Sequence, residues 1–176
     1  MTGRRSFLRN ERGAAAAEMA LMLPLLVVML FVTFEGGYFL WNELKVVKGV
    51  RDGARYAGRL DFTKYTCPST VDAATETSIK NVTRTGFPTA DNPNITGTDD
   101  PMIRGWTNTV PGVTVTLSCV GSMGGLYAAN SDNAPIVTVS ARVPYPDSPL
   151  SGLAAVLGFD TDINLNAQAQ SPVMGL

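Results

Sequence analysis

The sequence contains no histidine. This absence excludes Ser-His-Asp triads, Cys-His nucleophile pairs and every metal site that uses an imidazole ligand. The sequence also lacks an excess of charge of either sign, because it has 14 basic and 15 acidic residues and a formal net charge of -1. Such a balance gives no overall field that would favour a nucleic acid as partner. With 176 residues and an apolar fraction of 45%, the chain is long enough for one domain with a core and a further segment.

Cysteine is scarce as well. Cys67 and Cys119 are too far apart for a CxxC redox or zinc motif. If this part of the chain lies outside the cytoplasm, a disulfide between the two is the natural interpretation, and two separate buried thiols are the alternative. A disulfide that closes a loop of this length is expected to stabilise the fold by about 4 kcal/mol.

One long apolar run is present, from Ala14 to Phe34, and Glu18 is its only charged residue. As an α-helix the run would span about 31 Å, which matches the hydrocarbon core of a bilayer. Small residues precede the run and no A-x-A pattern follows it, unlike the arrangement in a secretory signal peptide. Pro24 removes one helical hydrogen bond and predicts a kink, either an ordinary one in an anchor or a weak point that helps the helix repack.

Basic residues flank the run on both sides. Four arginines precede it, at positions 4, 5, 9 and 12, and by the positive-inside rule they keep this end in the cytoplasm. Five basic residues follow it, Lys45, Lys48, Arg51, Arg55 and Arg59, and they oppose that orientation. The cysteine pair and the turn-rich remainder favour an extracytoplasmic C-terminal part.

The helix is predicted to continue past the membrane. Apolar residues recur at steps of three and four, which predicts a helix over residues 14–60 with a transmembrane part at about 14–41. These residues are Leu40, Val47, Val50, Ala54 and Ala57. Gly49, Gly53 and Ala57 form a stripe of small residues that permits close packing. The partner of this stripe is either a helix of another subunit or, as the favoured interpretation, the protein's own sheet.

Residues 61–176 are predicted to form an α+β domain. A second short helix is expected between Thr70 and Val82, with Val71, Ala74, Ile79 and Val82 on its apolar face. A long loop over 84–106 follows, and 148–159 is apolar enough for a short helix or a hydrophobic loop. Three segments alternate apolar and polar residues, which predicts a small antiparallel sheet packed on the long helix. Their inward-facing residues are Val113, Val115, Leu117 and Cys119; Val137, Val139, Ala141 and Val143; and Ile163, Leu165, Ala167 and Ala169.

No cofactor or metal site is predicted. The stretch Asp160-Thr-Asp-Ile-Asn begins like a calcium-binding EF-hand loop, but Leu165 stands where that loop needs glycine. Alternating polar side chains on a strand explain these residues more simply. No combination of acid, base and nucleophile points to an enzyme.

A basic leader ending at Gly13, then AAAAE with Glu18, then ALMLPLLVVMLF resembles the processing region of type IV pilin-like proteins. Together with FEGGYFLW and VKGVRDGARYAGR, it is similar in particular to the TadE-like family, minor pilins or pseudopilins of the tight-adherence (Flp) pilus. The resemblance covers about the first 60 residues. Met19 stands where the major pilin of that system commonly has tyrosine, which speaks against the major subunit.

The resemblance implies a type IV pilin-like fold, a leader of residues 1–13, and cleavage between Gly13 and Ala14 by a prepilin peptidase. It also implies that Glu18 pairs with the new N-terminal amine of a neighbouring subunit and sets register during assembly. The implied location is the bacterial inner membrane, as a single-pass protein that contacts an assembly platform and other subunits and has a role in adhesion. The alternative is a signal-anchored extracytoplasmic binding domain that is never processed or polymerised.

Overall fold

The computed structural model describes residues 11–89, 101–104, 106, 112–121, 123–130, 133–145 and 163–175. The chain divides into two compact units, Met1–Tyr38 and Phe39–Leu176. Helix α1, Glu11–Gly58, is 48 residues long and belongs to both units. The helix therefore begins three residues before the expected start and ends two residues before the expected end.

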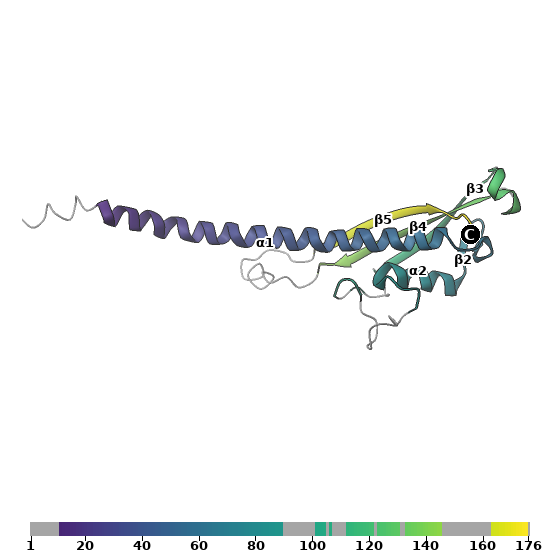
Figure 1. The fold of residues 1–176 in the computed structure, drawn as a ribbon, viewed down its shortest axis with the longest axis horizontal. Coiled ribbons are helices and arrows are strands. Elements are labelled where there is room, and N and C mark those ends of the chain that lie inside the picture. Colours follow the sequence, from purple (N-terminus) through teal and green to yellow (C-terminus); the bar gives the residue numbers. More distant parts are fainter. Residues whose placement is uncertain are drawn as a thin grey trace, which may run out of the picture. The chain divides into compact units, whose positions relative to one another are not determined.

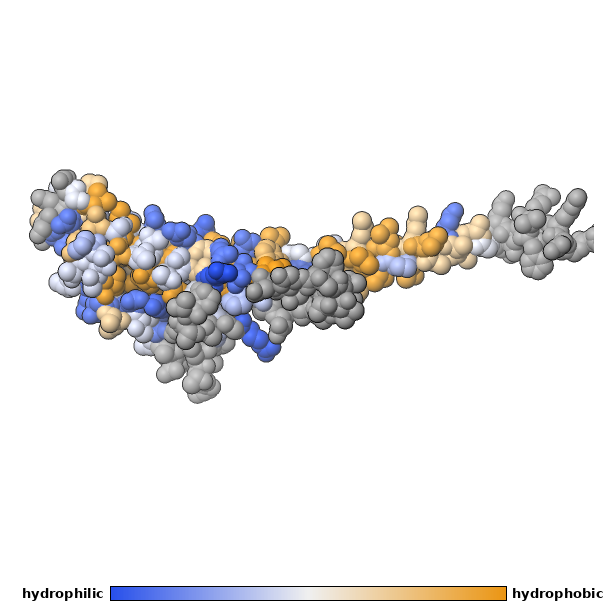
Figure 2. All heavy atoms as spheres, turned by 180° about the vertical axis from the view of Figure 1, so that it is seen from behind, coloured by the Kyte–Doolittle hydropathy of each residue, from blue (hydrophilic) through white to orange (hydrophobic). Residues whose placement is uncertain are grey.

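In the first unit, α1 consists largely of strong helix formers such as alanine, leucine and methionine, and its helical conformation continues through Pro24. The large apolar side chains are exposed, with Leu21 at 79% and Met19 at 70%. Figure 2 shows this part of the helix as a largely apolar surface. It is long and apolar enough to cross a membrane, and no described residue covers its most apolar stretch.

The second unit has an α+β fold, as the sequence predicts (Figure 1). Its elements after α1 are η2 (Phe62–Lys64), β1 (Tyr65–Thr66), β2 (Thr70–Val71), α2 (Ala73–Thr85), β3 (Val113–Val120), η3 (Gly125–Asn130), β4 (Ala134–Pro144) and β5 (Asn164–Pro172). Strands β1 and β2 form a small antiparallel hairpin, and β3, β4 and β5 form an antiparallel sheet in that order.

Each strand of the larger sheet buries one face, because side chains alternate between the two faces along a strand. The register aligns Leu117 with Val137 and Ala141 with Ala167, so that the apolar residues form rows across the sheet. The predicted inward face is confirmed for β3 and β4. In β5 it is wrong at Ile163, which precedes the strand and is 47% exposed.

The core lies between the inner face of the sheet and a helical layer made of α2 and the C-terminal part of α1. Four residues of α1 are buried in it: Val46, Val50, Ala54 and Ala57. Two predicted positions are corrected, because Leu40 is 59% exposed and Val47 is only partly buried. At 100° per residue, Ala57 lies between Val46 and Val50 on the helix surface, whereas Leu40 lies about 80° or more from all three.

Helix α2 begins later than expected because Asp72 caps its N-terminus and accepts a hydrogen bond from the Thr75 backbone N–H at 3.1 Å. Val71 consequently belongs to β2, and Ala74 faces solvent. The helix ends at Thr85 and is capped by Gly86, whose φ of 86° is the left-handed conformation that glycine tolerates best.

Strand β5 forms one edge of the sheet and carries no charged residue. Hydrogen bonds from Tyr145 N to Ile163 O (2.8 Å) and from Val173 N to Pro135 O (2.9 Å) fix which β5 residues face β4. Alternation then points the backbone N–H groups of Asn166, Gln168 and Gln170 away from the sheet. No described residue accepts a hydrogen bond from these three groups.

Candidate functional site

Gly13, Ala14 and Glu18 all lie near the start of α1. A Cβ atom added at Gly13 would meet nothing within 4 Å, so that no packing contact of the described chain requires glycine there. Glycine inside a helix costs about 1 kcal/mol relative to alanine. No contact among the described residues therefore accounts for Gly13.

Glu18 is exposed on the first unit and has neither a hydrogen bond nor an ion pair with any described residue. It lies four residues after Ala14, which places the two on the same side of the helix, one turn apart. In the uncleaved chain the nitrogen of Ala14 is a neutral amide. Only cleavage after Gly13 would turn that nitrogen into an amine, with a pKa of about 7.7 to 8.0 and a positive charge at neutral pH.

Gly49 and Gly53 both pack closely inside the second unit, and the element that approaches them is α2. The expectation that the sheet would be their neighbour is therefore corrected. A Cβ at Gly49 would collide with the backbone carbonyl oxygen of Thr83 and would lie 3.0 Å from the Trp106 ring. A Cβ at Gly53 would collide with the Thr83 hydroxyl oxygen. Ala57, the third residue of the stripe, is fully buried in the core.

The end of α1 is fixed by contacts that the sequence analysis missed. The Tyr65 hydroxyl donates a hydrogen bond of 2.7 Å to the Ala57 carbonyl, and the Met174 N–H donates one of 2.8 Å to the Gly58 carbonyl. Burial raises the pKa of the Tyr65 hydroxyl above its ordinary value. A two-residue strand carries too little periodicity to reveal such a contact in advance.

Cys67 and Cys119 form a disulfide, with Cα atoms 5.9 Å apart. Cys67 lies in the turn between β1 and β2, and Cys119 is near the end of β3. The bond therefore ties the hairpin that follows α1 to the sheet.

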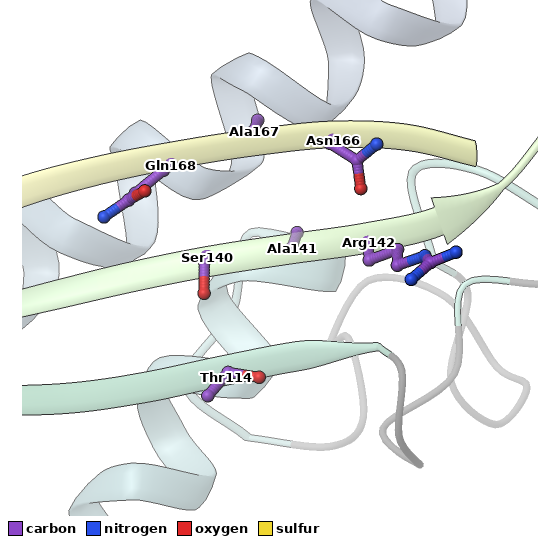
Figure 3. Close-up of a pocket in the computed structure, with 7 residues that line it drawn as sticks. All are labelled: Thr114, Ser140, Ala141, Arg142, Asn166, Ala167 and Gln168. Carbon is purple, nitrogen blue, oxygen red and sulfur yellow. The ribbon is translucent and has the colours of Figure 1, made fainter.

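The outer face of the sheet has a shallow hollow of about 350 Å³ (Figure 3). Thr114, Ser140, Asn166 and Gln168 supply hydroxyl and amide groups from three strands, and Arg142 is the only charged residue among the described residues of the lining. Among the described lining residues, no carboxylate or thiol stands beside the Thr114 and Ser140 hydroxyls to activate them as nucleophiles.

The described residues hold no group of three or more cysteines, aspartates or glutamates that could bind a metal ion. Asp160 and Asp162 lie outside the described residues, as do most of the loop over 84–106 and all of 148–159. Asn164, the last residue of that Asp-Thr-Asp-Ile-Asn stretch, is the first residue of β5.

Comparison with known proteins gives a match to one family model, described as TadE-like protein, over residues 13–55. The match lies within α1 and confirms the resemblance noted for this part of the sequence. It spans 43 of the 176 residues. No curated protein and no solved structure matches the chain.

Proposed function

We propose that this TadE-like chain is a minor pilin or pseudopilin of a tight-adherence (Flp) pilus. A prepilin peptidase cleaves it between Gly13 and Ala14, and Glu18 then sets its register in the assembly. The observation that carries the proposal is the combination, on one exposed helix, of a glycine without a packing contact in the described chain and a lone carboxylate five residues later.

The exposed apolar part of α1 anchors the chain in the inner membrane as a single span. Burying this surface in lipid is favourable at about 25 cal/mol per Å² of apolar area. The leader stays in the cytoplasm, where the peptidase cleaves it, and the α+β unit lies outside the cytoplasm. The disulfide between Cys67 and Cys119 agrees with that side of the membrane, because disulfides persist in oxidising compartments.

Glu18 explains why assembly follows cleavage. A carboxylate within a membrane helix costs about 2.5 to 3.5 kcal/mol at the bilayer centre and less near the interface, so that it gains from a cationic partner. Cleavage creates that partner as the amine of Ala14 on a neighbouring subunit. Other subunits and the inner-membrane assembly platform are the partners in this process, and attachment to surfaces is the function of the finished pilus.

N-terminal sequencing of the chain, expressed together with the prepilin peptidase of its host, tests the cleavage. We expect a mature protein that begins at Ala14. An intact leader, or a cleavage site after the apolar run, would instead support a signal-anchored binding domain that is not polymerised.

The role of Glu18 is tested with Glu18→Gln, which removes the charge and keeps the size of the side chain. We expect normal cleavage and membrane insertion but at least a tenfold loss of the chain from sheared pili. Glu43→Gln is the matched control, because it removes a carboxylate from the same helix within the second unit. Normal recovery of the Glu18→Gln variant in pili would refute the register role.

A further inference from the structure

The part of α1 in the second unit, with the residue that follows it, exposes one continuous stripe, here called the outer stripe. Its members are Leu40, Trp41, Leu44, Lys48, Arg51, Arg55 and Arg59, all of them exposed. At 100° per residue they fall within an arc about 100° wide, away from the arc of the four buried core residues. The stripe is therefore a second face of the helix, separate from the face that packs on the sheet and α2.

The outer stripe is apolar at its beginning and cationic afterwards. Leu40, Trp41 and Leu44 are each 59–66% exposed. The next four members are all basic, and none of them forms an ion pair with a described residue. Lys45 lies outside this arc, with its ammonium 5.5 Å from the centre of the Trp41 ring.

Helix stability accounts for only part of this charge. Cations three or four residues apart repel one another on a helix surface. Arg55, in the last turn of α1, gains from the helix dipole, and Arg59 lies just beyond the helix end. Lys48 and Arg51 lie too far from that end to gain in the same way. Both are exposed and have no ion pair with a described residue, so a carboxylate on a partner would add an interaction that they lack in the described chain.

We infer that the outer stripe is the docking surface for an acidic helix of a different pilus subunit. That helix presents apolar residues to Leu40, Trp41 and Leu44, and carboxylates to the cations that follow. The inference rests on the proposed function, because assembly brings the helices of neighbouring subunits together. Burying four cations against a neighbour without carboxylates would cost more than the apolar contact returns.

A second copy of this chain does not fit the stripe. Two parallel copies at the same height would place cations against cations, which is unfavourable. Beyond the apolar run that follows Glu11 and Glu18, a shifted copy could offer only Glu35, Glu43 and Asp52 from the described part of α1. These are eight or nine residues apart and partly buried, whereas the cations recur every three or four residues.

Phospholipid headgroups fit only the near end of the stripe. Arg59 lies fifteen residues after Leu44, or about 22 Å farther along the helix direction. Charges in water are screened over about 8 Å at physiological ionic strength. Headgroups beside Leu44 would therefore leave Arg55 and Arg59 without a partner.

The test uses the full chain in its native host, with Lys48→Glu/Arg51→Glu as the charge-reversal variant. The matched control is Arg104→Glu/Arg142→Glu, which makes the same change in net charge at two exposed arginines away from the stripe. We expect the charge-reversal variant to be cleaved and membrane-bound like the wild type, but to be recovered with sheared pili at least tenfold less. The control should be recovered as well as the wild type.

A photo-crosslinking residue, p-benzoylphenylalanine, in place of Leu44 identifies the neighbour. An adduct with another pilus subunit whose helix carries carboxylates at matching spacing supports the inference. An adduct with a second copy, an adduct with lipid only, or equal recovery of both double variants would overturn it. If the wild-type chain itself is neither cleaved nor found in pili, the proposed function fails; if it is found there and the charge-reversal variant is too, only this inference fails.

Discussion

The contact between α1 and α2 predicts that a third mutation, Thr83→Ala, restores stability to Gly53→Ala but not to Gly49→Ala. A double-mutant cycle tests this difference. The Cβ of Gly53→Ala collides with the Thr83 hydroxyl, which is fully buried and donates a hydrogen bond of 2.8 Å to the Ile79 carbonyl. The Cβ of Gly49→Ala collides with the Thr83 backbone carbonyl instead. A side-chain oxygen can be removed by mutation, whereas a backbone oxygen cannot.

Overpacking in a core costs about 1–3 kcal/mol, and replacing a helical glycine with alanine returns up to about 1 kcal/mol. Because Thr83 is fully buried and hydrogen-bonded to Ile79, we expect Gly53→Ala to be destabilising by about 1–2 kcal/mol. Thr83→Ala should restore about 1 kcal/mol of this loss. The rescue should be partial, since the new Cβ still lies 3.2 Å from the Cβ of residue 83. Gly49→Ala should lose at least as much as Gly53→Ala, and Thr83→Ala should not rescue it.

Urea unfolding of the full chain in detergent measures these differences. The fluorescence of Trp106 reports on the contact, because its ring is buried and adjoins Gly49. Trp41→Phe would remove the second tryptophan, which is exposed. Equal rescue of both glycine variants by Thr83→Ala, or a Gly53→Ala variant as stable as the wild type, would refute the packing argument.

Two further predictions concern the second unit. Replacing both Cys67 and Cys119 with alanine should lower its free energy of unfolding by about 4 kcal/mol, because the disulfide closes a loop with a sequence separation of 52 and so limits the entropy of the unfolded chain. Adding a reducing agent to the wild type should cause the same loss. Hydrogen bonds from the Thr75 hydroxyl and backbone N–H lower the pKa of the Asp72 carboxyl in the folded protein. The stability that this carboxylate contributes is therefore complete above its unfolded pKa of about 3.9, and it is lost as the pH falls through the lower folded pKa. Melting temperatures between pH 2 and 6 should therefore fall less steeply for Asp72→Asn than for the wild type, and parallel curves would contradict the role of this carboxylate.

The sequence predicted the elements with strong periodicity. The apolar run, the alternating strands and the α+β class are seen in the structure because hydrophobic pattern and chain length determine them locally. Boundaries were less accurate where a single polar residue decides, as when Asp72 starts α2 after Val71.

Contacts between elements were harder to predict. The spacing of Gly49 and Gly53 indicates close packing but not which element approaches, and here it is Thr83 of α2. Leu40 follows the same apolar spacing as the core residues yet faces outward. Periodicity describes one helix at a time, whereas burial depends on where the neighbouring elements end. Cleavage after Gly13 and the role of Glu18 remain predictions.

The uncharged edge of β5 has a consequence for the concentration at which this protein avoids unwanted pairing with other strands. Natural sheets commonly protect their edges with lysine, proline or a covering element, since open edges recruit other strands. The outward N–H groups of Asn166, Gln168 and Gln170 have no such protection among the described residues. Association through an open edge depends on concentration, so a low copy number would keep the chain out of unwanted sheets. Such an edge therefore suits the minor-subunit role proposed above better than that of a subunit made in many copies.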